Sequence, residues 1–127
     1  MSATAQAQIK SHRDLIAWQK AMDLVVLIYQ GTAAFPKHEL YGLTSQLRRA
    51  AASIPANIAE GQGHRSKPEF YQFLGNARGS LLELDTHLEL SLRLKYLTPG
   101  QYERIHKNVV EVGRLTNGLL RSLTSDL

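Results

Sequence analysis

The apolar positions of this chain recur every three or four residues, which is the period of an amphipathic α-helix. Four such stretches occur, at about 15–34, 40–60, 67–95 and 99–122. No stretch shows the alternation of a β-strand. Because the connections are short, successive helices should be antiparallel neighbours. The sequence therefore predicts an all-α fold, an antiparallel up-down-up-down four-helix bundle.

Polar residues and prolines mark where these helices should begin. Asp14 is a suitable N-cap for the first helix. The segments 66–69 (SKPE) and 98–101 (TPGQ) have the capping-box spacing, with proline in the first turn, and predict the starts of the third and fourth helices. We expect one domain over residues 14–123, between a disordered tail at 1–13 and a short C-terminal tail at 124–127.

Pro55 leaves two interpretations of the second helix open. The helix can continue with a kink, because proline lacks the N–H that the preceding turn would receive. Alternatively, it ends at Ser53 and restarts at Pro55 as the first turn of a new segment. Gly61 is expected just past the end of this helix, as its C′ residue.

The first helix is apolar on two sides. We expect one side in the core, formed by Leu15, Trp18, Met22, Val25 and Tyr29. The other side carries Ile16, Leu24, Leu27 and Ile28. A helix that is apolar nearly all round is usually buried on both sides. We therefore predict that the second side contacts another subunit, together with Tyr71 and Leu82 of the third helix. The alternatives are cover by the N-terminal tail or simple exposure.

A polar stripe follows the second helix beside its apolar stripe, and a similar one follows the third. Together they predict a polar network of Arg49, Ser53, Asn57, Glu60, Asn76, Ser80 and Glu83. If the two helices are antiparallel, Arg49 and Glu83 should form an ion pair that fixes their register. A catalytic or ligand-binding carboxylate is the alternative. Alanines flank the first stripe, so another backbone could come close there; they are Ala52, Ala56 and Ala59.

Composition and charge limit the chemistry, the cellular location and the partners that the sequence predicts. The 127 residues include no cysteine, which excludes disulfides and thiolate chemistry and fits a reducing cytoplasm. No signal peptide or membrane-spanning segment is expected, and no contact with a membrane. The net charge of +4 and pI of about 9.6 are compatible with nucleic acid. The candidate phosphate-binding residues are Arg48, Arg65, Lys67, Arg78, Arg104, Lys107 and Arg114. The alternative is a solvated basic face.

The sequence offers little for catalysis. It contains no nucleophile elbow, zinc-protease motif, Walker loop or dinucleotide-binding motif. A di-iron bundle needs two inward Glu-x-x-His pairs, and only Glu103 and His106 match. Glu83 and His87 are four residues apart and could pair or bind a metal. We predict no cofactor, no metal and no catalytic residue.

Two motifs resemble a known family: SIPANIAEG at 53–61 and ARGSLLEL at 77–84, together with DLIAWQKAMDL near the start. Over about residues 14–123 the chain resembles the bacterial four helix bundle proteins, first found in intervening sequences of large-subunit ribosomal RNA genes. The resemblance implies a ring-shaped homopentamer. The family also includes the accessory variability protein of diversity-generating retroelements, a basic pentamer that binds a reverse transcriptase and nucleic acid.

The resulting hypothesis is a non-enzymatic, cytoplasmic, oligomeric scaffold or adaptor. Its partners would be copies of itself, a pentamer by the resemblance, and RNA, DNA or a reverse transcriptase held by basic surfaces. One alternative is a metal- or small-ligand-binding helical bundle enzyme. Another is a passenger protein with no partner beyond itself.

Overall fold

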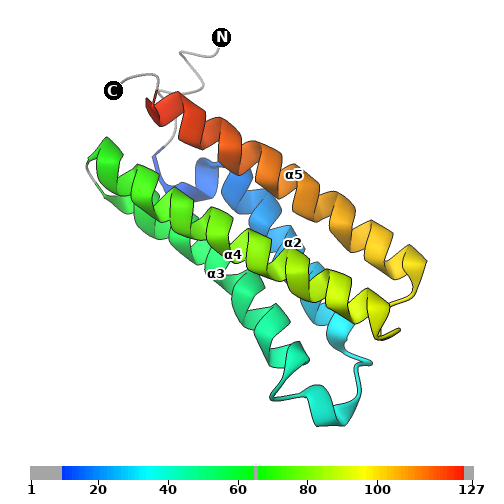
Figure 1. The fold of residues 1–127 in the computed structure, drawn as a ribbon. Coiled ribbons are helices and arrows are strands. Elements are labelled where there is room, and N and C mark those ends of the chain that lie inside the picture. Colours follow the sequence, from blue (N-terminus) through cyan, green and yellow to red (C-terminus); the bar gives the residue numbers. More distant parts are fainter. Residues whose placement is uncertain (1–9, 65, 125–127) are drawn as a thin grey trace.

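The computed structural model describes residues 10–64 and 66–124. Its long helices are α2 (Ile16–Thr32), α3 (Leu43–Gly63), α4 (Lys67–Arg93) and α5 (Pro99–Thr124). Short 3-10 turns, η1 (His12–Asp14) and η2 (Lys37–Glu39), precede α2 and α3. No strand occurs in the described ranges. Each helix runs back along the one before it, and α5 closes the bundle against α2 (Figure 1). The predicted up-down-up-down bundle is confirmed.

Side-chain caps begin α4 and α5 where the sequence predicts them. The Glu69 N–H donates to Ser66 Oγ at 3.2 Å. At the start of α5, the Gln101 N–H donates to Thr98 Oγ1 at 3.1 Å, and the Thr98 N–H donates to Gln101 Oε1 at 2.9 Å. These bonds satisfy N–H groups that a helix start leaves without a backbone partner. The capping box at 98–101 is therefore confirmed, and Ser66 is confirmed as the N-cap of α4.

The N-terminal end differs from the prediction. The N-cap of α2 is Leu15, with no side-chain cap, and not Asp14. The Asp14 carboxylate instead accepts the N–H groups of Lys10 at 2.8 Å and Ser11 at 3.2 Å. These two bonds hold its pKa below the ordinary value. Of the predicted tails at 1–13 and 124–127, residues 1–9 and 125–127 lie outside the described residues, whereas His12–Asp14 form η1 and Thr124 ends α5.

Helix α3 continues through Pro55, which is buried, so the interpretation with a single helix is the correct one. The helix also passes Gly61, the expected C′ residue, and ends at Gly63. A Cβ on Gly61 would lie 2.8 Å from Phe73 Cβ and 2.9 Å from Phe70 Cδ1. Gly61 therefore allows α3 and α4 to come close beside their turn, and does not terminate the helix.

The core takes one face from each long helix, and on α2 that face differs in part from the predicted one. Its members from α3, α4 and α5 include Leu43, Leu47, Ile54, Ile58, Leu74, Ala77, Leu81, Leu84, Leu88, Ile105, Val109 and Val112. From α2 it takes Ala17, Ala21, Leu24 and Ile28. The predicted inner residues Met22 and Tyr29 are exposed. In the described part of the chain, no helix has the length and apolar character needed to cross a bilayer.

Candidate assembly and nucleic-acid interfaces

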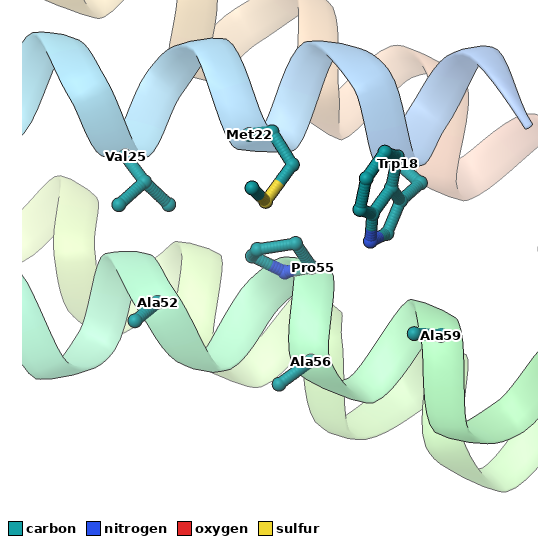
Figure 2. Close-up of a pocket in the computed structure, with 7 residues that line it drawn as sticks. All are labelled: Trp18, Met22, Val25, Ala52, Pro55, Ala56 and Ala59. Carbon is teal, nitrogen blue, oxygen red and sulfur yellow. The ribbon is translucent and has the colours of Figure 1, made fainter. Parts of the chain in front are cut away.

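An open apolar groove lies between α2 and α3 and is the clearest candidate for an interface. Its volume is about 310 Å³, and it is lined by Trp18, Met22, Val25, Ala52, Pro55, Ala56 and Ala59. The three larger side chains of α2 reach towards α3, where the ring of Pro55 faces them (Figure 2). Ala52 and Ala56 are exposed, so the surface of α3 is low and open beside this row. We call this feature the α2–α3 groove.

The groove corrects which side of α2 is available to a partner. Leu24 and Ile28, predicted to meet another subunit, are 1% and 0% exposed and belong to the core of their own bundle. Leu27 is half-buried and packs against that core. Both apolar stripes of α2 have the same spacing, but Ala17 and Ala21 let the helix approach its neighbours closely on one side. That side therefore turns inward, whereas Met22 and Tyr29 of the other stripe are exposed and Trp18 and Val25 are half-buried.

The other predicted interface residues do lie on the surface. Ile16, Tyr71 and Leu82 are 59%, 41% and 58% exposed. The last two belong to a long apolar stripe on the outside of α4, which we call the α4 outer face. It consists of Tyr71, Gly75, Gly79, Leu82, Leu90 and Leu94, all of them exposed.

Two glycines in the α4 outer face have no explanation inside the subunit. A Cβ added to Gly75 or Gly79 would meet nothing within 4 Å. Glycine within a helix costs ~0.5–1 kcal/mol relative to alanine. At two other positions the bundle uses this cost for close packing: at Gly61, and at Gly31, where a Cβ would lie 2.9 Å from Ile105 Cδ1. Gly75 and Gly79 instead leave a shallow, open strip of backbone on the surface.

The predicted polar network forms only at its centre. Ser53 Oγ lies 2.8 Å from Ser80 Oγ, and Asn57 Nδ2 donates to Ser53 O at 2.8 Å and to its Oγ at 3.0 Å. In the described residues no ion pair joins Arg49 to Glu83, so that prediction is wrong. Glu83 pairs instead with His87, at 3.6 Å.

The outer members of the network are solvated. Arg49, Glu60, Asn76 and Glu83 are all exposed. Long charged side chains at a wet helix edge gain little from pairing, because water screens them and holding them costs entropy. The two serines meet because they lie deeper, where α3 and α4 face each other. The small residues of the network, and not its charged residues, therefore fix the register of α3 against α4.

Of the predicted phosphate-binding residues, Arg48 and Arg114 are engaged within the subunit. Arg48 Nε donates to Thr32 Oγ1 at 3.0 Å, and its guanidinium lies 4.5 Å from the centre of the Tyr29 ring. This arginine ties α3 to α2. Arg114 Nη2 lies 2.8 Å from Glu111 Oε2, and this pairing lowers the pKa of the glutamate. Lys67 and Arg78 are exposed on α4, while Arg65 lies outside the described residues.

The other two predicted residues, Arg104 and Lys107, contribute to a basic hollow between α2 and α5. The hollow has a volume of about 610 Å³ and is lined by Lys20, Arg104, Lys107, Asn108 and Glu111. In the described part of the chain, no carboxylate lies within salt-bridge distance of its three cations. We call it the α2–α5 basic hollow.

Lys20 was missed by the sequence analysis. It belongs to the site only because α2 and α5, the first and last helices, lie side by side. A smaller hollow of about 130 Å³ shares Arg104 and includes Gln30 and Gln101. The amide groups of Gln30 and Gln101 therefore share a hollow with Arg104 along the same helix pair.

Glu103 and His106, the candidate metal ligands, do not form a metal site together. His106 Nε2 lies 3.4 Å from Asp85 Oδ1 on α4, and its ring stacks on Tyr102 with centroids 5.2 Å apart. Burial, with the nearby carboxylates, raises the pKa of Tyr102. Glu103, the other half of the Glu-x-x-His match, does not join this pair. Across residues 10–64 and 66–124, no three His, Asp or Glu side chains are grouped so that they could hold a metal ion.

Comparison with known proteins agrees with this architecture. Residues 13–118 match the model of the 23S rRNA-intervening sequence protein family. A solved structure from Bacteroides thetaiotaomicron, described as a protein of unknown function from the S23 ribosomal protein family, superimposes with a TM-score of 0.75. It is 27% identical, and the match covers 83% of this chain and 98% of the relative. No curated protein matches. The chain belongs to the 23S rRNA-intervening sequence protein family.

Proposed function

We propose that this protein is a non-enzymatic scaffold that assembles with copies of itself, and that the α2–α3 groove is part of the contact. The observation that carries the proposal is the groove itself. Trp18, Met22 and Val25 form an apolar wall beside a low floor of alanine, and this hollow is open to water. Contiguous exposed apolar surface of this kind marks interaction sites. Aromatic residues and methionine are enriched in such contacts.

A second copy of the chain is the occupant that the subunit best supports. The α4 outer face supplies a second exposed apolar surface on the same molecule, so the chain carries both sides of a contact. Symmetric association of identical chains is also the commonest form of oligomer. The resemblance described above suggests five subunits, and we adopt the pentamer as the number to test.

The substitution Ala56→Arg tests this proposal. A long cation on the floor of the groove should block close approach, so the variant should remain monomeric at micromolar concentration. Because Ala56 is exposed in the subunit, helix content by circular dichroism should not change. Light scattering measures the mass. The control is Gln46→Arg, which adds the same charge at an exposed position of α3 outside the groove. A monomeric wild type, or full assembly of Ala56→Arg, would contradict the proposal.

Nucleic-acid binding is a second candidate function, and the α2–α5 basic hollow favours it. Lys20, Arg104 and Lys107 surround one hollow without a salt-bridge partner in the described chain, and such a cluster suits phosphate. The names of the family and of the solved relative refer to 23S rRNA and to S23 ribosomal protein, so RNA is the first nucleic acid to test. The proposal places the protein in the cytoplasm. A reverse transcriptase is the protein partner to test next.

The double substitution Arg104→Ala with Lys107→Ala should weaken RNA binding at low salt. Each lost phosphate contact reduces the slope of log affinity against log salt by about 0.7 for a single strand. The double variant should therefore lose up to about 1.4 of that slope. Filter binding over a salt series measures it. Arg121→Ala, also on α5 but outside the hollow, is the control. Equal binding by the wild type and the double variant would remove this hollow from the interface.

A further inference from the structure

The subunit presents two different apolar surfaces, and their shapes correspond. Resting on the proposed self-assembly, we infer that the α4 outer face of one copy seats in the α2–α3 groove of the next. The junction is then heterologous: every copy gives one surface and receives with the other. This deepens the proposed function by naming the segment that fills the groove.

The lengths of the two surfaces agree. The alanine floor of the groove runs from Ala52 to Ala59, a separation of seven positions or about 10 Å of helix. On α4, Gly75 and Leu82 are also seven positions apart, again about 10 Å. Two turns of α4 therefore match the two turns of α3 that line the groove.

The relief of the two surfaces is also complementary, with bulky side chains on one and open space over glycines on the other. On the α2 side of the groove, Trp18, Met22 and Val25 reach towards α3, and Met22 is 41% exposed (Figure 2). On α4, nothing occupies the space over Gly75 and Gly79. The exposed Met22 can therefore approach the α4 backbone of a neighbour at the glycines. Leu82, at the other end of the same segment, can enter over the alanines.

Gly75 and Gly79 also favour the α4 outer face over a hydrophobic peptide as the occupant of the groove. Nothing in the subunit requires Gly75 or Gly79, whereas Gly61 is required by its own neighbours Phe70 and Phe73. Two exposed glycines one turn apart, with open space over both, allow the backbone or a large side chain of another subunit to come close to α4. A hydrophobic peptide in the groove would not explain α4.

The positions of the two surfaces determine the kind of assembly. In the bundle α4 packs against α3 and α5, and α2 packs against α3 and α5, so α2 and α4 are diagonal neighbours. The groove beside α2 and the outside of α4 therefore face different sides of the subunit (Figure 1). A contact between two different patches propagates from copy to copy and gives a ring when the rotation closes.

Mixing two blocked variants tests the inference. Leu82→Arg blocks the α4 outer face and keeps the groove, whereas Ala56→Arg blocks the groove and keeps the α4 outer face. Each variant alone should be monomeric. An equimolar mixture should form a heterodimer and nothing larger, because one intact junction remains between the two variants. Light scattering and native mass spectrometry measure the masses, and circular dichroism checks that both variants fold.

Two further variants sharpen this test. Leu94→Arg makes the same change at the C-cap of α4, about 18 Å beyond Leu82 and outside the two turns that the groove can cover, and should assemble normally. Gly79→Ala should raise the dissociation constant at least about tenfold while the helix content stays unchanged.

The outcomes separate the two proposals. If Leu82→Arg and Gly79→Ala assemble as the wild type does while Ala56→Arg does not, the α4 outer face is not the occupant, and self-assembly through the groove stands. If the mixture of blocked variants stays monomeric, the heterologous junction is wrong. A monomeric wild type overturns both proposals.

Discussion

Replacing Leu24 by alanine should lower the free energy of unfolding by about 2–5 kcal/mol, the range for removing a buried leucine and leaving a cavity. Leu24 is 1% exposed and lies on the inner face of α2 with Ala21 and Ile28. The side chain of Ala21, on the same face of α2, is too small to fill the cavity that the substitution leaves. Urea unfolding, followed by circular dichroism, measures the change.

Met22→Ala is the matched control for this prediction. Met22 lies two residues away on the same helix but is 41% exposed and lines the α2–α3 groove. Below the concentration at which the protein assembles, its loss should cost less than about 1 kcal/mol, because much of its surface is already wet. Comparable losses for the two variants would contradict the orientation of α2 described here.

Gly61→Ala should also destabilise the bundle, by about 1–3 kcal/mol. Helix propensity alone predicts the opposite sign, because alanine is the better helix former. The new Cβ would lie 2.8 Å from Phe73 Cβ and 3.3 Å from the Phe70 carbonyl oxygen. Neither atom belongs to the flexible end of a side chain, so α3 and α4 must separate beside their turn. Thermal and urea unfolding of the variant measure the loss.

Gly118→Ala makes the same change where there is space. Its Cβ would find its nearest neighbour, Arg121 Nη2, at 4.0 Å. This variant should be more stable than the wild type by up to about 1 kcal/mol. Opposite signs for the two substitutions would show that contact between helices, and not propensity, requires glycine at position 61. A stabilising Gly61→Ala would refute the close approach of α3 and α4.

The two apolar surfaces give the scaffold proposal a simple physical form. Each subunit folds around one set of leucines and isoleucines and keeps a second set, on α2 and α4, outside the core. The basic hollow lies between α2 and α5, away from the face of α4 that we assign to the junction. In a ring, these hollows would repeat once per subunit, and their combined field would attract a polyanion more strongly than one copy does.

Sequence patterns were sufficient wherever a helix has one apolar stripe or a local cap. The inner residues of α4, such as Leu74 and Leu84, follow from spacing alone, since polar residues occupy the other faces. The starts of α4 and α5 follow from Ser66 and Thr98, because a cap depends on residues three positions apart.

The candidate sites were predicted less well, because they depend on neighbours distant in sequence. Arg48 looked like a surface cation, but Tyr29 and Thr32 of α2 hold it within the subunit. Lys20 joins the basic hollow only when α5 returns to lie beside α2. The alanines of α3 did suggest close approach by another backbone, and the structure places them on the floor of an open groove.

By itself, the sequence determined that this protein is a four-helix bundle with short antiparallel connections, because helical period, caps and loop lengths are local properties. Only the tertiary structure decided which stripe of α2 is buried. Two stripes of equal period are equivalent in an isolated helix, and the choice between them depends on how well each fits the helices opposite. Ala17 and Ala21 are buried against those helices, so Leu24 and Ile28 became core and Met22 and Tyr29 became surface.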